Sequence, residues 1–393
     1  MAIDNQGIST GKTVRELVEE IENELLFNFR KRFVSAKDVE IDKVDWDKWR
    51  IDRMKEFDSF KRENRSIIKK YMKDISKAMV NDFEESYRHG LNIVNKQVKE
   101  AAKKGAKFNP KSNIPIFTKN VRVLKELQKA QDTLNRTYTV AINSLESHFL
   151  HTIQTARNQP LARTLFGAIE MANKELIRHG IVGAVTTNQR RLNIANHIEM
   201  TVIEASQEML FIGEATKSED LGIYTVYISQ HRSSCPLCTP WQGKVLIDDV
   251  YQPGVPDGKH ELLSNAIKAG LFHYNCRHNR ITYIEGLDVI PDTEKNILRG
   301  MSKKEQERLY QAEQLQRANE RKIREWKRAQ VMALTPEEYQ KATAKVRMYQ
   351  ARNRHLVKST DGLYRNYWRE KPGFKVPADV RWRNLKYDLK LVE

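Results

Sequence analysis

The sequence contains few cysteines and no long apolar run. Only three of its 393 residues are cysteine, too few for a disulfide framework, so metal binding or buried thiols are the roles left for them. No stretch approaches the roughly 20 consecutive apolar residues of a membrane-spanning helix, and the N-terminus MAIDNQGISTGK lacks the apolar core of a signal peptide. We therefore expect a protein without a membrane span that is made and kept in a reducing cytosol.

The composition favours an elongated, mostly helical chain. Charged residues make up 30% of the sequence and apolar residues 40%, which suits extended helices better than one compact globule. The net charge is +17, and residues 291–393 hold 25 Lys/Arg against 14 Asp/Glu. This basic terminal quarter predicts a polyanionic partner, most simply double-stranded DNA bound through its phosphates. A solvated lysine-rich helix surface is the alternative.

Helical periodicity dominates the first 215 residues. The pattern at 45–103 fits either one bent helix or two helices broken near Gly90. A Gly/Pro/Asn loop at 103–115 precedes the third pattern, which is close to a heptad repeat and fits an intramolecular bundle as readily as a coiled-coil dimer. The predicted helices lie at 17–33, 45–103, 124–152, 162–178 and 187–215.

The pattern changes after residue 215. The run IYTVYIS (Ile223 to Ser229) carries strand-favouring residues on both faces, which predicts a buried strand, and NRITYIEGL (Asn279 to Leu287) is the next strand candidate. A module of roughly 70 residues has a small core, for which a metal staple would be useful. We predict a mainly α protein with long N-terminal helices in a domain at 1–215, a small α+β module at 216–290, and a basic helical C-terminal extension at 291–393.

All three cysteines fall within this central module. Cys235 and Cys238 form a Cys-x-x-Cys pair and His273 and Cys276 a His-x-x-Cys pair, together the four ligands of a closed structural zinc site. The 34 residues between the pairs exceed the usual zinc-finger spacing. Closing that loop costs roughly 3 kcal/mol, whereas a structural zinc ion contributes on the order of 10 to 16 kcal/mol, so the spacing does not forbid the site. The alternative fourth ligands are His278, His231 and, more weakly, His260.

The same residue types allow other interpretations. Three buried thiols beside an unrelated histidine would form no site at all. Cys276 with a histidine could act as nucleophile and base, but nothing in the sequence singles out one activated thiolate. A metal-dependent nuclease is the stronger enzymatic alternative, because NCRHN (275–279) superficially resembles His-Asn-His sites, although its metal ligands cannot be assigned from the sequence.

The C-terminal quarter returns to helix. Ser302 with Glu305 forms a capping box, and Thr335, followed by proline and two glutamates, marks the start of a second helix. In the first helix four arginines recur at steps of four, three and four, which predicts a phosphate track on one face. The tail after residue 359 interleaves aromatic and basic residues that would grip nucleic acid or dock onto a partner protein. The predicted nucleic-acid-binding residues are Arg317, Arg321, Arg324, Arg328, Arg365 and Arg369.

The motifs around the cysteines resemble those of a known family. CPLC, PWQGKV (Pro240 to Val245), AGLFHYNCRH (Ala269 to His278) and TYIEG (Thr282 to Gly286) in this order are similar to the signature of the tailed-bacteriophage minor capsid protein 2 family, which is related to the Mu F-type head morphogenesis proteins. The resemblance spans about residues 187–371. Members often carry other residues at the first cysteine pair, so zinc at this site is predicted from this sequence alone.

The resemblance implies a virion protein present in few copies and without enzymatic activity. It implies a place at the portal vertex inside the phage head, after assembly in the host cytoplasm, and a role in head assembly, DNA packaging or DNA delivery. The portal protein and the major capsid protein are the implied partners, with packaged DNA nearby. We therefore expect a structural, DNA-contacting head component, with a metal-dependent nuclease as the alternative.

Overall fold

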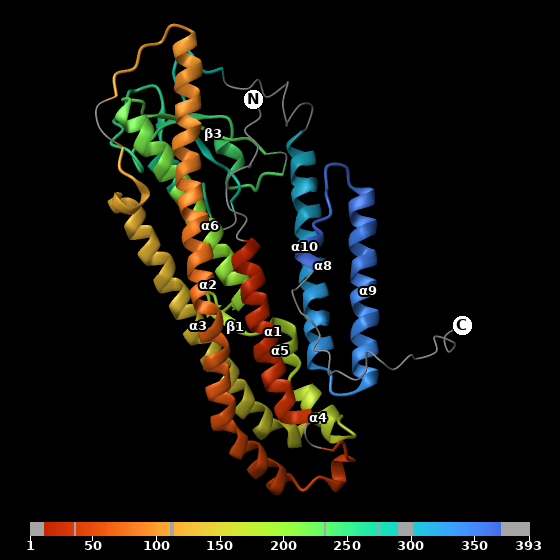
Figure 1. The fold of residues 1–393 in the computed structure, drawn as a ribbon. Helices are drawn as coiled ribbons and strands as arrows, with labels where there is room; N and C mark the ends of the chain where they lie inside the picture. The colour runs from red at the N-terminus through yellow and green to blue at the C-terminus, as the bar shows by residue number, and fades with distance from the viewer. Residues whose placement is uncertain are drawn as a thin grey trace. The chain divides into compact units, whose positions relative to one another are not determined.

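The structure is a computed structural model that describes the residues 12–34, 37–110, 114–231, 233–273, 276–289 and 302–370 (Figure 1). It divides into two compact units, each made of three separate stretches of chain. The first unit comprises Met1–Val14, Asp74–Asn135 and Ile198–Leu315. The second comprises Arg15–Lys73, Arg136–His197 and Gln316–Glu393. The predicted aromatic and basic tail beyond residue 370 lies outside the described residues.

Long α-helices account for most of the described chain, which confirms the prediction of a mainly α protein. The helices are α1 (Lys12–Val34), α2 (Trp46–Lys103), α3 (Val121–Thr155), α4 (Leu165–Ala172), α5 (Lys174–His179), α6 (Ile194–Asp220), α7 (Leu263–Lys268), α8 (Lys303–Met332), α9 (Pro336–Ser359) and α10 (Tyr367–Glu370). The strands are β1 (Val182–Val185), β2 (Arg191–Asn193), β3 (Thr225–Ile228), β4 (Val245–Ile247), β5 (Glu261–Leu262) and β6 (Arg280–Thr282). None of the described helices combines the length and apolarity that crossing a membrane requires.

Helix α2 runs unbroken for 58 residues, so the alternative of two helices separated near Gly90 is wrong. Gly90 instead allows a close crossing between α2 and α6. A β-carbon added at Gly90 would lie 2.2 Å from the carbonyl oxygen of Leu210, and one added at Gly213 would lie 2.2 Å from that of Tyr87. The two glycines let the helix backbones touch, which no larger residue would permit.

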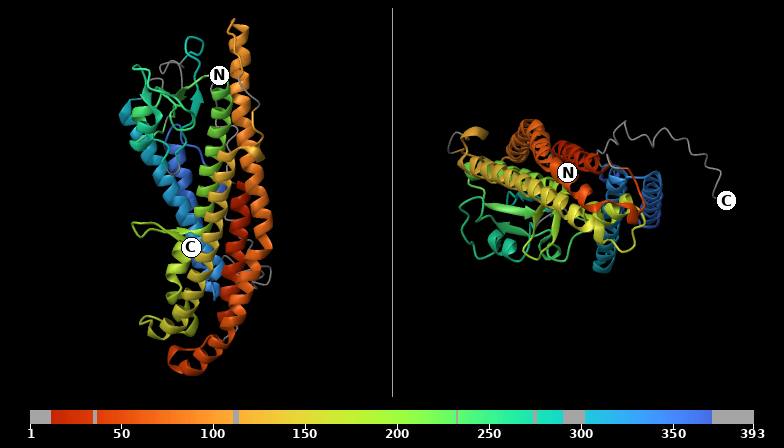
Figure 2. Two further views of the ribbon diagram at one scale, coloured as in Figure 1. Left: turned by 90° about the vertical axis from the view of Figure 1, so that its left-hand side faces the viewer. Right: turned by 90° about the horizontal axis from the view of Figure 1, so that it is seen from below.

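The first unit also contains a four-stranded sheet in the order β5-β4-β3-β6 (Figure 2). Strand β3 lies in the interior of the sheet, antiparallel to both β4 and β6, while β4 and β5 run parallel. Val226, Tyr227 and Ile228 are all buried, which confirms the predicted two-sided burial of this strand. The second predicted strand is also present, although β6 is only three residues long.

The second unit has an aromatic core between α1, α2 and α3. Phe60 of α2 stacks on Phe149 of α3 with ring centroids 4.6 Å apart, and Phe33 of α1 lies 5.2 Å from the same ring. The apolar stripe of α3 is therefore covered by helices of its own chain here. This confirms the intramolecular bundle, one of the two arrangements that the heptad-like pattern allowed.

The prediction of continuous helix at 187–215 is wrong at its N-terminal end, where β1 and β2 form a hairpin. Two polar contacts explain the difference. Glu22 of α1 accepts hydrogen bonds from the backbone N–H of Ile181 (3.1 Å) and from the Asn193 amide (2.6 Å). The Asn193 carbonyl oxygen in turn accepts the backbone N–H of Ala195 (3.1 Å), so Asn193 caps α6 and sets its start. The predicted helix at 162–178 is likewise two short helices, α4 and α5.

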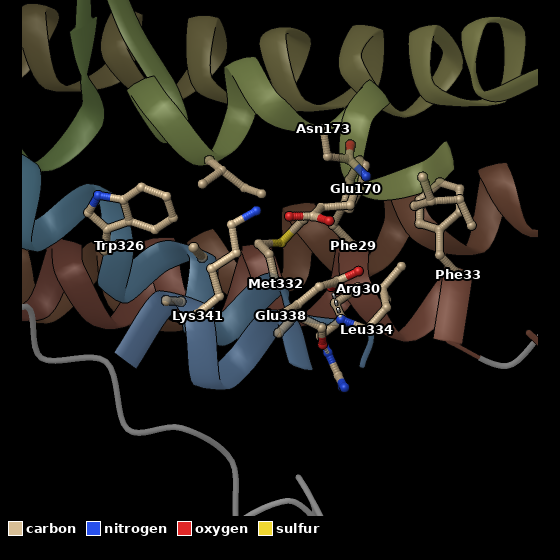
Figure 3. A pocket seen from close by; sticks show the side chains of 15 residues that line it. Phe29, Arg30, Phe33, Glu170, Asn173, Trp326, Met332, Leu334, Glu338 and Lys341 are labelled. Atoms are coloured by element: carbon tan, nitrogen blue, oxygen red, sulfur yellow. Dashed lines mark hydrogen bonds between the residues drawn. The ribbon is translucent and has the colours of Figure 1, made fainter. Parts of the chain in front are cut away.

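Within the second unit, the C-terminal part of α8 and α9 form an antiparallel hairpin (Figures 1 and 2). The predicted cap of α9 is confirmed, because the Thr335 hydroxyl accepts the backbone N–H of Glu338 at 3.3 Å. A cavity of about 20 Å³ lies between this hairpin, α1 and α4, which is room for about one water molecule rather than a substrate. Figure 3 shows Glu170 and Glu338 together in it, and burial, with the neighbouring Glu170 carboxyl, raises the pKa of Glu338 to about 7.

The buried His148 makes the second unit sensitive to acid. Its ring lies among α1, α3 and the start of α5, with Nε2 3.1 Å from Asn173 Oδ1. Burial lowers its pKa to about 4. The unfolded chain takes up this proton near pH 6.5 and the folded chain only near pH 4. Since the unfolded state binds more protons in that window, stability falls as the pH decreases through it.

We expect His148→Gln to reduce this acid sensitivity. The loss in unfolding free energy between pH 7 and pH 5 should be smaller in the variant by about 2 kcal/mol, as follows from 1.36 kcal/mol per pKa unit. Urea denaturation at the two pH values measures it. His355→Gln, at an exposed position of α9, is the control and should behave like the wild type. Equal pH dependence in the His148 variant and the wild type would contradict a buried neutral imidazole.

Candidate metal centre

The loop after β3 holds the first cysteine pair in a tight turn. The backbone N–H of Cys238 donates to the carbonyl oxygen of Cys235 at 3.1 Å, and the Thr239 hydroxyl donates to the same oxygen at 2.8 Å. A second turn forms where the N–H of Cys276 donates to the carbonyl oxygen of His273 at 2.8 Å. Each turn brings the two potential ligands of one sequence motif to the same side of the backbone.

The two turns converge, so that the predicted metal ligands lie together across a separation of 38 residues. The Sγ atom of Cys235 is 2.9 Å from Nε2 of His273, and the Sγ atoms of Cys238 and Cys276 are 3.5 Å apart. His278 joins them, with Nδ1 3.4 Å from Cys276 Sγ. The donor atoms form two trios in which every atom lies within 4.8 Å of the others: Cys235, Cys238 and His273, and Cys238, Cys276 and His278.

The other two histidines considered as ligands belong to neither trio. The His231 ring lies against that of His278 with centroids 4.7 Å apart, and its Nε2 is 3.3 Å from the Ser229 hydroxyl. Burial lowers the pKa of His231 to about 4, so it is neutral at physiological pH. His260 is paired with Asp257, with 2.6 Å between Nδ1 and Oδ2. The cluster of thiols and imidazoles is therefore limited to five side chains.

The sulfur atoms at the centre of this cluster share a proton. Hydrogen bonding from Cys238 lowers the pKa of Cys276 to about 4, and the same bond together with burial raises the pKa of Cys238 well above its usual range. The arrangement thus favours deprotonation of Cys276 beside the Cys238 thiol. A divalent metal stabilises such a group by displacing the shared proton, which is the way thiolate sites bind zinc.

The same pair does not fit a catalytic thiol. A Cys276 thiolate near His278 resembles a nucleophile with its base, but the two side chains are only 8% and 3% exposed. A substrate would have to displace the surrounding residues before it reached the sulfur. The geometry therefore suits a closed site better than a reactive one.

The WQGK motif shapes the turn that precedes β4. Gly243 adopts a φ of 77°, which favours glycine, and a β-carbon there would lie 2.6 Å from the terminal amide nitrogen of Gln230, which would have to shift. Gln242 accepts the backbone N–H of His231 at 2.6 Å, and Lys244 lies over the Trp241 ring at 4.7 Å. The motif connects β3 to β4 and fixes the loop that carries the cysteines.

An ion pair beneath the cluster was not predicted. Arg280, the first residue of β6, is fully buried and donates from Nε (3.0 Å) and Nη2 (2.6 Å) to Asp248 Oδ2. Its Nη1 donates to the carbonyl oxygen of Phe211 at 3.2 Å and lies 3.5 Å from Glu214. The sequence did contain a signal, because an arginine that precedes ITYI in a predicted strand needs a buried carboxylate partner.

The six arginines predicted to bind nucleic acid have different surroundings. Two of the four on α8 use their donors within the second unit: Arg328 is buried and donates to the carbonyl oxygens of Ile177 (3.1 Å) and Arg178 (3.0 Å), and Arg324 donates to that of Arg369 (2.7 Å). Arg321 is exposed and Arg317 partly exposed. Nearer the tail, Arg365 forms a bidentate pair with Glu370, and Arg369 lies over the Trp368 ring.

The comparisons with known proteins agree with the motifs. Two similar proteins, both named "Structural protein", come from Lactococcus phages: that of phage LL-H is 30% identical over 161 residues, and that of phage mv4 is 31% identical over 106 residues. These matches cover 39% and 26% of this chain, and 40% and 81% of the relatives, so the chain spans less than half of the LL-H protein. No solved structure matches.

The family assignment has a broader basis than these relatives. The sequence model of the family described as Phage minor capsid protein 2 matches residues 6–358. The match includes the cysteine loop and the GLFHYNCRH segment, which supply the candidate metal ligands, and the WQGK turn between them. The chain therefore belongs to the phage minor capsid protein 2 family.

Proposed function

We propose that this protein is a non-enzymatic component of the phage head, located at the portal vertex, that assists head assembly, DNA packaging or DNA delivery. The observation that carries the proposal is the family match over residues 6–358, together with the burial of the reactive side chains. Long helices provide extended surfaces for protein contacts, for which the portal protein and the major capsid protein are the proposed partners. We propose that the chain has three functional regions, the helical region 1–215, the α+β module 216–290 and the basic C-terminal region 291–393.

Contact with packaged double-stranded DNA is the second part of the proposal. The C-terminal region 291–393 carries 11 more basic than acidic residues, and nucleic acid is the polyanion present in a phage head. Of the arginines predicted to serve this role, the exposed Arg321 and the partly exposed Arg317 are the best placed on α8. Arg328 contributes by holding α8 in place.

We further propose that the metal is zinc and that its role is structural. Three thiols and imidazole nitrogens are the donor set that zinc prefers, and carboxylate oxygens, which magnesium prefers, do not belong to either trio. The predicted set is Cys235, Cys238, His273 and Cys276, with His278 as an alternative fourth ligand. A closed tetrahedral site of this kind has no open position for a substrate or an activated water molecule. It would fasten the cysteine loop to the segment before β6.

The structural and nuclease alternatives differ in one direct measurement. We expect the purified full-length protein, with zinc or with magnesium, to leave supercoiled DNA intact, because the candidate metal ligands are buried. We also expect purified particles of the phage that encodes it to contain the protein at low copy number by quantitative mass spectrometry. Nicking that disappears in His273→Ala or His278→Ala would contradict the structural function, as would absence of the protein from particles.

Zinc content tests the metal independently. We expect protein purified under reducing conditions to contain about one zinc ion per chain by elemental mass spectrometry, since the donor atoms suffice for one tetrahedral ion. Cys276→Ser should lose the ion and unfold at a lower temperature, because the loss removes a link between the two turns. His355→Gln, far from the cluster in sequence and exposed, should retain both. Wild-type protein with no bound zinc would contradict the proposed cofactor.

A further inference from the structure

We propose that the imidazole ligand of this site is His278 and that the ligand set is Cys235, Cys238, Cys276 and His278. His273, the histidine that the sequence spacing favours, then positions the Cys235 thiolate instead of binding the metal. This inference rests on the proposed zinc site and specifies its chemistry. It follows from three separate features of the cluster: the spacing of the donor atoms, their burial, and the second hydrogen bond of the ring.

The spacing of the donor atoms favours His278. Zinc–sulfur bonds of about 2.3 Å and zinc–nitrogen bonds of about 2.0 Å place tetrahedral ligands about 3.8 Å (S to S) and 3.5 Å (S to N) apart. Cys238 and Cys276 are 3.5 Å apart, and Cys276 is 3.4 Å from His278 Nδ1, close to these values. Cys235 and His273 are 2.9 Å apart, which is closer than two ligands of one ion. Cys235 lies near Cys238 but outside the trio of Cys238, Cys276 and His278, so it would have to move toward that trio when an ion binds.

Burial separates the two histidines in the same way. His278 is 3% exposed, and its trio with Cys238 and Cys276 is entirely buried, as expected for a closed structural site. His273 and Cys235 are both partly exposed. The backbone of His278 is also fixed, since its carbonyl oxygen accepts the Gln207 side-chain amide of α6 at 2.5 Å. A ligand held at this position would need little rearrangement to bind an ion.

The far side of the His278 ring has the partner that a metal-bound histidine requires. Histidine ligands almost always donate their second ring N–H to an oxygen, which orients the ring and makes the ligand nitrogen more basic. When Nδ1 faces the sulfur atoms, Nε2 faces the Ser234 hydroxyl at 3.4 Å. Ser234 is itself buried and donates to the carbonyl oxygen of Cys235 at 3.3 Å, so this contact links the histidine to the first cysteine turn.

A matched pair of variants, His278→Gln and His273→Gln, tests the assignment in the zinc-loaded full-length protein. X-ray absorption at the zinc edge detects the multiple scattering of a bound imidazole ring, and we expect three sulfur ligands and one imidazole in the wild type. The imidazole signal should persist in His273→Gln and disappear in His278→Gln. Zinc affinity should fall about 10- to 100-fold in His273→Gln, as for loss of a positioning residue, and further in His278→Gln.

His273→Gln is decisive even if the buried substitution prevents folding. Loss of the imidazole signal in His273→Gln would overturn the assignment and restore the spacing-based ligand set. A signal that persists in both single variants would overturn it as well, because neither histidine alone would then be required. Absence of zinc from the wild type would remove the metal site itself, an outcome distinct from a wrong choice of histidine.

A second inference concerns helix α9, and a different observation carries it. We infer that α9 presents the face that contacts DNA. From Tyr339 to Ser359 the helix has six Lys/Arg residues and no Asp or Glu. Arg347, Arg354 and Lys358 recur at steps of seven and four, so they share one face, and all three are exposed. They have no carboxylate partner within the described part of the chain, in contrast to Arg324 and Arg328 of α8, whose donors are used internally.

The geometry of this face suits a duplex. The opposite side of α9 is buried through Ala342, Val346 and Asn353. The helix is therefore held with its cations facing outward. Arg347 and Lys358 are about 16 Å apart along the axis at 1.5 Å per residue, and duplex DNA carries one charge per about 1.7 Å. The three cations can therefore each reach a phosphate of the same duplex. An unpaired cationic row gains most from a partner with such a dense, regular charge.

The salt dependence of DNA binding tests this inference. For the full chain and a 30-base-pair duplex, Arg347→Gln, Arg354→Gln and Lys358→Gln combined should lower the slope of log K against log salt by up to about 2.7, at 0.9 per lost phosphate contact. The control removes three exposed cations of α2, to which no DNA contact is assigned, and should change the slope less: Lys69→Gln, Lys73→Gln and Lys77→Gln. An unchanged slope in the α9 variant overturns the inference. The inference is also overturned if the substitutions weaken binding to anionic lipid vesicles but not to DNA.

Discussion

The buried guanidinium of Arg280 is the constraint on which the α+β module depends. A fully buried cation is tolerated only when its donors are satisfied and one negative charge balances it. Asp248 does both, and its other oxygen accepts the backbone N–H groups of Val250 (3.1 Å) and Tyr251 (2.9 Å). Burial raises the pKa of Glu214 to about 8, and the guanidinium makes its shorter contacts with Asp248, at 3.0 and 2.6 Å, rather than with Glu214 at 3.5 Å. Strand β6, the turn after β4 and helix α6 therefore have to assemble together.

This ion pair also determines where the metal ligands lie. Arg280 follows His278 by two residues, and the intervening Asn279 donates its backbone N–H to Ser229 (2.8 Å) at the end of β3. The ion pair thus holds the second ligand segment against the first without any metal. The proposed ion would add a second link between the same two segments. This division would explain how so small a module holds three thiols close together: protein contacts position them, and the proposed metal would neutralise the charge that their deprotonation creates.

The sequence predicted local structure well and long-range polar contacts poorly. The buried strand at Ile228, the cap at Thr335 and the convergence of Cys238 with Cys276 each depend on a few residues with strong preferences. The hairpin before α6 depends on Glu22, which is about 170 residues away in the sequence. The four arginines on one face of α8 look alike in the sequence, but Arg328 donates to backbone carbonyl oxygens in the structure. Periodicity identifies a face of a helix, but only packing shows whether that face meets water or protein.

The distribution of reactive and charged groups also bears on function. An enzyme exposes its activated groups to substrate, whereas here Cys276, whose pKa is lowered by its hydrogen bond with Cys238, and the His278 ring are both buried. Exposed cations such as Arg354 and Lys358 have no carboxylate partner within the described residues, and their proposed role is binding without chemistry. The ion pair and the reactive thiols are buried, whereas the cationic surface is open. This distribution is consistent with a protein that acts by contacting other molecules. The DNA contact proposed for this surface would need charge spacing rather than base recognition, because phosphate contacts carry no sequence information.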